Sequence, residues 1–326
     1  MPSVGLPGAA YHNALWMEAR KAHSAPLERA AQERILGGMF GFFCIHKPAG
    51  PTSHDVVALV RRRFGRGAKV GHAGTLDPFA EGVLVLCVGP ATRLASYVQA
   101  RPKRYRAVVR LGATSTTDDP EGEIAAKDDA PMPEEAAVRA VVQRFVGTID
   151  QVPPAHSAVH VGGRRAYKLA RAGRPVDLHP RPVEVHAIDV LSYEFGRLRL
   201  DIRCGTGTYV RALARDIGAA LGTGGYCEQL VRTAVGEFRI EDAVRPEELV
   251  PPEHLLPAAL AVAGMPRVIV SADQAEDLRH GKRLALPDGA GGDEIALFSS
   301  AGELLAIAEP RDDGAALQPT RVFLNS

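Results

Sequence analysis

Hydrophobic and polar positions follow two different spacings along the chain, and together they predict an α+β fold. Continuous apolar runs at Phe42–Ile45 and Val83–Val88 are typical of strands that are buried on both faces. In Phe195–Cys204, apolar residues alternate with polar ones, which indicates a strand with one exposed face. Because such strands are interspersed with helical segments, we expect a mixed, mainly antiparallel sheet flanked by helices.

Helical spacing is present in three segments: Asp55–Phe64, Ala91–Gln99 and Glu134–Phe145. Either Thr52 or Ser53 can cap the first of them, since both side chains accept hydrogen bonds from the free N–H groups of a helix N-terminus. After a proline-rich span, short apolar segments alternate with glycine-rich turns between residues 264 and 326. This pattern predicts a small C-terminal β-barrel.

Composition and charge restrict the class of protein without identifying a partner. Of the 326 residues 46% are hydrophobic, which is enough for a sizeable core. The net charge is only +1, so a nucleic-acid site would have to come from local clusters of basic residues. The four cysteines lack paired C-x-x-C spacing and are expected to be reduced core thiols rather than metal ligands. No apolar run is long enough to cross a bilayer, and we expect a cytoplasmic protein.

The segment Gly71–Pro78 holds a carboxylate on a rigid loop directly before a buried strand. Gly71 and Gly74 permit tight backbone turns, and Pro78 restricts its own backbone and that of Asp77. The ordinary explanation of such an aspartate is that it caps a turn. An acid at the start of a fully buried strand is also well placed for chemistry, so Asp77 is the first candidate catalytic residue.

Two basic segments flank this loop and the strand that follows it. Arg61–Arg63 ends the first predicted helix and, with Arg66 and Lys69, fits both helix-dipole stabilisation and a phosphate track. In Lys103–Arg106, Tyr105 stands among cations. A tyrosine in a strand usually packs in the core, but among cations it can also stack on a base flipped out of an RNA.

Three segments resemble motifs of the TruB-type tRNA pseudouridine synthases, which make pseudouridine at position 55 in the T-loop of transfer RNA. They are Gly71–Pro78, Lys103–Arg106 and Cys204–Gly218. The resemblance implies that Asp77 is the catalytic nucleophile and that Arg211 pairs with it. The ordinary alternative for Arg211 is an ion pair with Asp216 on the surface of a helix, which would contribute little.

The same resemblance implies roles for further side chains. Tyr105 is expected to stack on the target base as part of the catalytic set, and His72 to insert where the RNA has opened. The opening strand from Gly41 also resembles that of the family. Tyr209 is expected to contact the base, and Leu230 to line the uracil pocket. Lys47 and Pro48 are also expected to contact the substrate.

The resemblance also implies a division of the chain into domains. We expect a loosely ordered extension at 1–38, a catalytic domain at 39–263 and a PUA-like RNA-binding domain at 264–326. The basic insertion at about 120–182 resembles the thumb with which bacterial members clamp the T-loop, and guide-RNA-dependent relatives lack most of it. We therefore expect a monomeric enzyme that binds the T-arm of tRNA without a guide RNA, a membrane or a cofactor.

The chemistry of the motif residues separates the alternatives. Isomerising uridine needs one nucleophile and a closed pocket, whereas glycoside hydrolysis normally needs two carboxylates. Attack of Asp77 on C6 of the base and attack on C1′ of the sugar both stay open. Gly205 and Gly207 hint at a dinucleotide site but lack the third glycine of that motif. The main alternative is a non-catalytic protein that binds or folds tRNA, and the combination of Asp77, Tyr105 and Arg211 favours the enzyme.

Overall fold

The computed structural model describes residues 38–324 except 65–68, 128, 131, 158, 162, 167–168, 170–171, 174–175, 195, 288 and 313. Nearly all of the extension predicted at 1–38 lies outside the described residues. The same holds for Arg66 and for part of the basic insertion.

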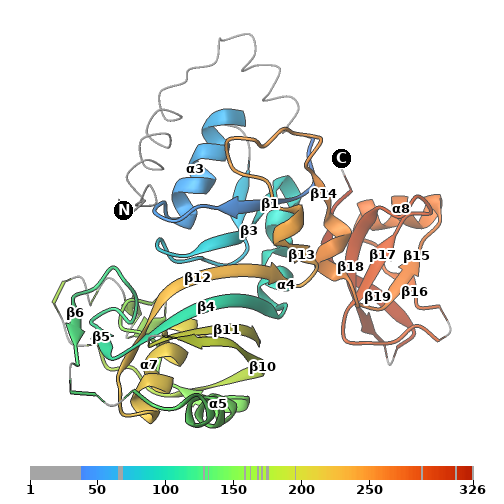
Figure 1. Cartoon of the computed structure of the whole chain (residues 1–326). Helices are drawn as coiled ribbons and strands as arrows, with labels where there is room; N and C mark the ends of the chain where they lie inside the picture. Colours follow the sequence, from blue (N-terminus) through green and yellow to red (C-terminus); the bar gives the residue numbers. More distant parts are fainter. Residues whose placement is uncertain are drawn as a thin grey trace.

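A large, mainly antiparallel sheet forms the body of the molecule (Figure 1). Its strands lie in the order β14-β1-β3-β12-β4-β11-β10-β7, with β2 beside β3 and β13 beside β12. The predicted mixed, mainly antiparallel sheet is thus confirmed. The strands are β1 (Gly41–Lys47), β2 (Val70–His72), β3 (Glu81–Val88), β4 (Lys103–Leu111), β7 (Gly147–Gln151), β10 (Arg181–Glu194), β11 (Arg197–Cys204), β12 (Gly225–Val235), β13 (Phe238–Arg239) and β14 (Leu256–Pro257).

One parallel seam interrupts this antiparallel sheet. β3 and β12 run parallel and share only two register pairs, Val231 with Glu81 and Arg232 with Gly82. A side-chain carbon added to Gly82 would lie 2.2 Å from the Arg232 carbonyl oxygen, so the two backbones can approach this closely only with glycine there. The seam joins the two halves of the sheet.

Helices cover one face of the half formed by β4, β10, β11 and β12. α5 (Glu135–Gln143) and α7 (Val210–Ala220) pack there on apolar side chains such as Leu200 and Ile202. The opposite face of these strands is polar, with Arg106 of β4 opposite Asp201 of β11. The alternating pattern of the sequence therefore gives one covered and one open face, as predicted.

The half formed by β1 and β3 is covered on both faces. α3 (Ser53–Phe64) packs on one face through residues such as Val56 and Val60. The other face packs against a second cluster that includes η1 (Gly89–Leu94), α4 (Ala95–Ala100) and η3 (Ala258–Val262). Because polar side chains have no place on either face, the run Val83–Val88 is continuously apolar, and its predicted burial is confirmed.

The segment Ala91–Gln99, predicted as one helix, is divided between two helices of different type. A 3-10 helix, η1, occupies the first part and the α-helix α4 the second. Leu94 at the junction has φ −96° and ψ 0°, outside the regular α-helical range, and Pro90 near the start of η1 lacks the N–H that a longer helix would use.

The C-terminal part of the chain forms a second, five-stranded sheet, which lies beside α4 (Figure 1). Its order is β15-β17-β18-β19-β16, and α8 (Ala272–Arg279) is the helix of this part, begun by a capping box at Ser271. The strands are β15 (Arg267–Ile269), β16 (Leu284–Ala285), β17 (Ile295–Phe298), β18 (Leu304–Arg311) and β19 (Ala316–Val322).

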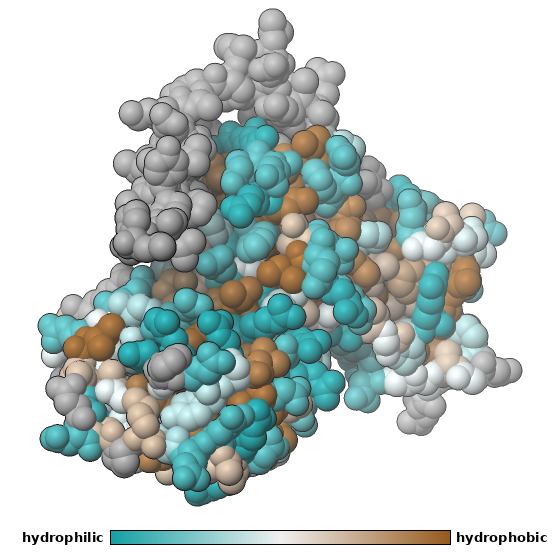
Figure 2. Space-filling view, in the orientation of Figure 1, coloured by the Kyte–Doolittle hydropathy of each residue, from teal (hydrophilic) through white to brown (hydrophobic). Residues whose placement is uncertain are grey.

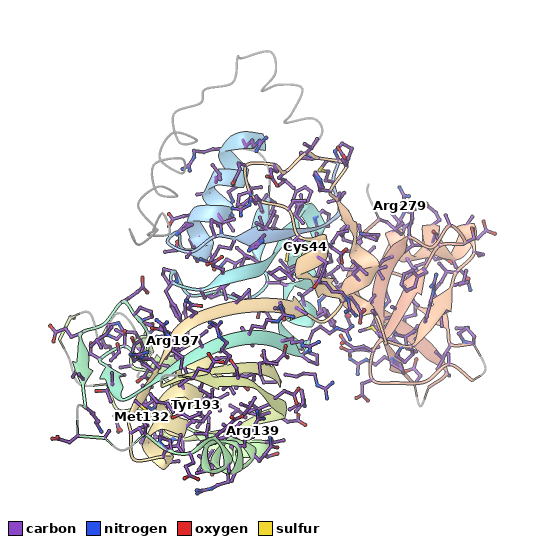
Figure 3. All side chains as sticks on the ribbon, viewed as in Figure 1. Cys44, Met132, Arg139, Tyr193, Arg197 and Arg279 are labelled. Atoms are coloured by element: carbon purple, nitrogen blue, oxygen red, sulfur yellow. The ribbon has the colours of Figure 1, made fainter. Side chains whose placement is uncertain are left out.

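Smaller elements complete the fold. They are two hairpins, β5 (Ala113–Ser115) with β6 (Ile124–Ala126) and β8 (His160–Val161) with β9 (Arg164–Arg165), and the 3-10 helix η2 (Ile240–Asp242). All four cysteines are free and buried, which confirms the prediction of core thiols, and burial raises the pKa of Cys44 to about 12 (Figure 3).

Hydrophilic side chains cover much of α3 and of the lobe around α5, with apolar patches between them (Figure 2). The most exposed large apolar side chains come from separate segments: Ile124, Met132, Leu191 and Ile269. Scattered exposure of this kind is normal for a folded protein. No helix in the described part of the chain combines the length and apolar character needed to span a membrane.

Candidate active site

Asp77 lies on the loop between β2 and β3, close to the parallel seam. Gly74, with φ +107°, turns the chain before it, and the amide of Ala80 donates to the Asp77 carbonyl oxygen to close a turn after it. The Asp77 side chain is 32% exposed, so its carboxylate is reachable from outside while its loop is held in place.

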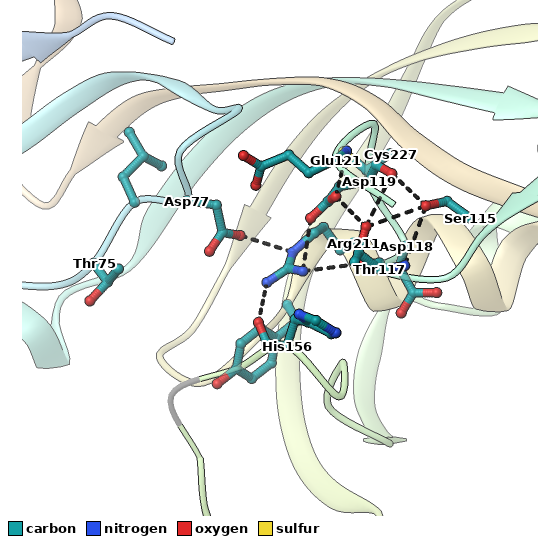
Figure 4. Close-up of polar contacts among 12 residues, drawn as sticks. Thr75, Asp77, Ser115, Thr117, Asp118, Asp119, Glu121, His156, Arg211 and Cys227 are labelled. Carbon is teal, nitrogen blue, oxygen red and sulfur yellow. Dashed lines mark hydrogen bonds and ion pairs between the residues drawn. The ribbon is translucent and has the colours of Figure 1, made fainter. Parts of the chain in front are cut away.

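Arg211, in the first turn of α7, faces this carboxylate (Figure 4). Its Nε lies 2.9 Å from Asp77 Oδ2, and the Arg211 side chain is only 3% exposed. The contact is an ion pair without the alignment of a hydrogen bond, since Nε has no hydrogen-bond partner among the described residues. The alternative prediction, a surface ion pair between Arg211 and Asp216, is wrong, because Asp216 pairs with Arg215 instead.

A second carboxylate holds the other side of the Arg211 guanidinium. Nη1 lies 2.9 Å from Asp119 Oδ2 and also donates to the Thr117 carbonyl oxygen at 3.0 Å, while Nη2 donates to the His156 carbonyl oxygen at 3.0 Å (Figure 4). Asp119 is itself buried. Three acceptors therefore fix the plane of the guanidinium and keep its Nε on the side of Asp77.

The loop after β5 supplies this second carboxylate. Asp119 Oδ1 accepts from the Thr117 hydroxyl and from the Glu121 amide. Asp118, in the left-handed region at φ 61°, accepts from Arg215 Nη1 at 3.0 Å, and its carbonyl oxygen accepts from the Cys227 amide of β12. A non-glycine residue in this conformation is uncommon, and here two strong contacts hold it.

Tyr209 lies at the N-terminal cap of α7. Its amide donates to Gln151 Oε1 at 2.8 Å, and Gln151 Nε2 donates to its carbonyl oxygen at 3.1 Å. Gln151 is buried, so this pair fixes the start of the helix that carries Arg211. The Tyr209 ring is half-buried, and burial raises the pKa of its hydroxyl.

Tyr105 and Leu230 lie in the same apolar cluster beside the loop, with Leu76 and Ala80. Tyr105 is 9% exposed and Leu230 6%, so both side chains lie at the base of the site and do not project from the surface. Burial raises the pKa of the Tyr105 hydroxyl, and the neighbouring Arg232 acts in the opposite direction. The core explanation of Tyr105 and its proposed place beneath a base are thus compatible.

Lys47 is fully buried at the end of β1. Its Nζ donates to three carbonyl oxygens, those of Pro48, Pro51 and Pro78, at 2.9, 2.8 and 3.1 Å. These contacts use all three N–H groups of the ammonium, so the side chain supports the loop after Asp77 rather than offering a donor to a ligand. Pro48 enters this arrangement through its carbonyl oxygen.

His72 ends β2 and packs against α3. Its ring and the ring of His54 lie edge to face with centroids 5.1 Å apart. The structure thus brings Asp77, Arg211, Tyr105, Tyr209 and Leu230 around one position and places Lys47 behind the loop. Sequence reasoning missed Asp119, because an aspartate pair beside proline and glycine usually marks a solvated turn, and no local signal marked this one as part of the site.

The arrangement concentrates opposite charges beside one partly exposed carboxylate. The pKa of Glu121 is raised by burial and by the charges of Asp119 and Asp77. Such a site can present an ionised carboxylate to a bound molecule while a buried arginine holds it in place.

Family models match nearly the whole of the described chain. Residues 61–210 match the model described as TruB family pseudouridylate synthase (N terminal domain). Residues 211–260 match tRNA pseudouridylate synthase B C-terminal domain, and residues 265–324 match tRNA Pseudouridine synthase II, C terminal.

Curated relatives and solved structures agree with these matches. The chain is 45% identical over 295 residues to tRNA pseudouridine synthase B of Thermobifida fusca, with 88% of this chain and 99% of the relative covered. It is 41% identical to the protein of that name from Synechocystis, with 88% and 100% covered. A chain in the crystal structure of a Cbf5-Nop10-Gar1 complex has a TM-score of 0.69 and 27% identity, with 93% and 92% covered.

Proposed function

Since the chain belongs to the TruB family of tRNA pseudouridine synthases, we propose that Asp77 is the nucleophile with which it isomerises uridine in tRNA. The isomerisation breaks the bond between N1 of the base and C1′ of the ribose, turns the base and joins C5 to C1′. The observation that carries the assignment is the Asp77–Arg211 pair, a 32% exposed carboxylate held by a buried cation.

The other side chains of the site divide the remaining work. Arg211 pairs with the Asp77 carboxylate and, because Asp119 binds its opposite edge, keeps one orientation while the substrate reacts. Tyr105 lies beneath the target base, and Leu230 provides an apolar wall beside it. Stacking on an aromatic ring offsets part of the cost of unstacking the base from the RNA. Tyr209, at the start of α7, contacts the base from the side.

The substrate is proposed to be the T-arm, with isomerisation at position 55. His72 then enters the space that the flipped base has left, and residues from about 120 to 182 and the second sheet bind the rest of the tRNA. We propose that the protein acts as a cytoplasmic monomer without a guide RNA. The tRNA substrate is supported by the relatives named tRNA pseudouridine synthase B, which are 41% or more identical to the chain, whereas the Cbf5 chain is 27% identical.

The test is pseudouridine formation in an unmodified tRNA transcript. Wild-type protein should convert one uridine, and a transcript with cytidine at position 55 should give none. Asp77→Asn should bind the transcript as wild type does but lose turnover, because an amide is not a nucleophile here. Asp242→Asn is the matched control, since that aspartate is exposed in η2, outside the segments assigned to tRNA binding. Binding without turnover by wild type would instead support a non-catalytic tRNA-binding or tRNA-folding protein.

A further inference from the structure

The loop around Asp77 is held by side chains from three separate elements. Ser53 of α3 donates its hydroxyl to the Leu76 carbonyl oxygen and accepts from the Leu76 amide, both at 2.9 Å. Lys47 of β1 donates to the Pro78 carbonyl oxygen at 3.1 Å. Arg232 of β12 binds the remaining part of the loop. A segment without regular structure thus has its backbone groups satisfied by polar side chains on both sides of Asp77.

Arg232 spans the loop and the strand that follows it. Its Nη2 donates to the Gly74 carbonyl oxygen at 3.3 Å and its Nη1 to that of Thr75 at 3.1 Å. Its Nε donates to the carbonyl oxygen of Val83 in β3 at 2.7 Å. One rigid guanidinium therefore fixes the distance between the start of the loop and the strand into which the loop leads.

The Arg232 guanidinium is buried, and the acceptors that it binds are neutral. The residue is 3% exposed, and the three acceptors are main-chain carbonyl oxygens rather than carboxylates. Burying a cation in this way costs free energy that the carbonyl dipoles only partly offset. A neutral side chain would avoid this cost. Stability alone therefore does not explain why an arginine occupies this position.

The sheet register places that charge at the site. Arg232 lies opposite Tyr105 across β4 and β12, so both side chains point to the same face of the sheet. It also lies opposite Gly82 at the parallel seam. The Arg232 charge opposes the effect of burial on the hydroxyl of Tyr105 and lowers the pKa of Lys47 together with burial. The guanidinium therefore acts on groups on both sides of Asp77.

From these contacts we infer that Arg232 is a positioning residue for the nucleophile. It holds the Gly74–Asp77 loop on the seam, so that the Asp77 carboxylate faces both Arg211 and the base above Tyr105. The inference rests on the proposed function, since it assigns to Arg232 a part in the same reaction. It does not require Arg232 to touch the substrate.

The test separates positioning from folding and from binding. Arg232→Lys keeps the charge but cannot reach three carbonyl oxygens, and Arg232→Met removes the charge with similar volume. A misplacement of about 1 Å costs roughly 10²-fold in rate, so single-turnover rates should fall by about that factor in Arg232→Lys and further in Arg232→Met. Transcript Kd should stay within about threefold, because the larger part of the proposed RNA contact, made by residues from about 120 to 182 and by the second sheet, lies elsewhere.

Two further variants make the result decisive. Arg101→Met removes another arginine that binds main-chain carbonyl oxygens, those of Ala261 and Ala263, away from the loop, and it should leave the rate of the folded protein unchanged. Ser53→Ala should reproduce the loss of rate with binding retained, even if both Arg232 variants fail to fold. An unchanged rate in Ser53→Ala or in a folded Arg232 variant, or an equal loss in Arg101→Met, would overturn the inference. An inactive wild-type protein would overturn the proposed function instead.

Discussion

Lys47 links the geometry of the site to pH. Burial lowers the pKa of its ammonium to about 8 from 10.5, although the charges of Asp77 and Glu81 oppose the shift. A neutral amine has two N–H donors for the three carbonyl oxygens that the ammonium now binds. We therefore expect the single-turnover rate to fall as the pH rises through about 8, because the loop after Asp77 loses one of its contacts.

Stability should change in the opposite direction over the same range. Between pH 8 and 10.5 the folded protein has lost the Lys47 proton while the unfolded chain keeps it, so the Lys47 contribution to the free energy of unfolding rises with pH. Loss of rate without unfolding in this window separates the two effects. Lys47→Met has no titrating group, so an equal alkaline loss of rate in that variant would contradict the assignment to Lys47.

Asp119 is the residue on which the orientation of Arg211 depends. Asp119→Ala removes one carboxylate from a buried pair, in which both side chains are 3% exposed. Breaking such a pair on one side costs about 3–5 kcal/mol, since the remaining charge stays buried. Urea unfolding should report this loss, and the rate of the folded fraction should also fall because Arg211 can turn away from Asp77. Wild-type stability in Asp119→Ala would show that the pair holds nothing in place.

At the scale of elements, η1 and α4 join the main sheet to the second sheet. Arg93 of η1 donates to the Val322 carbonyl oxygen at 2.6 Å and lies 4.7 Å from the centre of the Phe323 ring. The Tyr97 hydroxyl of α4 donates to Glu294 at 2.5 Å and accepts from Arg321. Apolar residues of both parts form one cluster. The two sheets should therefore keep a fixed orientation.

This fixed orientation predicts a difference between long and short substrates. If the second sheet binds tRNA outside the T-arm, as proposed above, a loosened joint should weaken binding of whole tRNA and leave an isolated T-arm hairpin unaffected. Tyr97→Phe removes the hydroxyl and keeps the ring, so KM for whole tRNA should rise several-fold while KM for the hairpin stays the same. Equal changes for both substrates would place the effect in the active site instead.

At the scale of the whole molecule, local pattern predicted the elements, and long-range contacts decided the details. The buried run at Val83–Val88 followed from its composition alone. The choice between Thr52 and Ser53 did not: Thr52 accepts from the Asp55 amide at the start of α3, whereas Ser53 turns to Leu76 on the catalytic loop. No local signal shows which of two adjacent hydroxyls meets a loop that arrives more than twenty residues later.

The same limit applies to the candidate site. The motif around Asp77 and the basic strand with Tyr105 were recognisable as sequence, because each is a compact segment. Arg232 and Asp119 act through contacts between segments 92 to 158 residues apart, with Arg211 and Gly74 as partners. Each looks ordinary in its own segment, and only the folded sheet shows that both are buried charges beside one carboxylate.

The balance of charge over the molecule predicts how binding depends on salt. With a net charge of +1, attraction to RNA must come from local cations rather than from the overall field. Arg61, Arg62 and Arg63 of α3 are all exposed, and Arg61 and Arg63 also bind main-chain carbonyl oxygens of neighbouring segments. If Arg62 contacts a phosphate, Arg62→Ala should reduce the slope of log affinity against log salt by about 0.7–0.9. Arg197→Ala, which removes a β11 arginine paired with Glu228, is the matched control. An unchanged slope in Arg62→Ala would show that this end of α3 faces solvent when RNA binds.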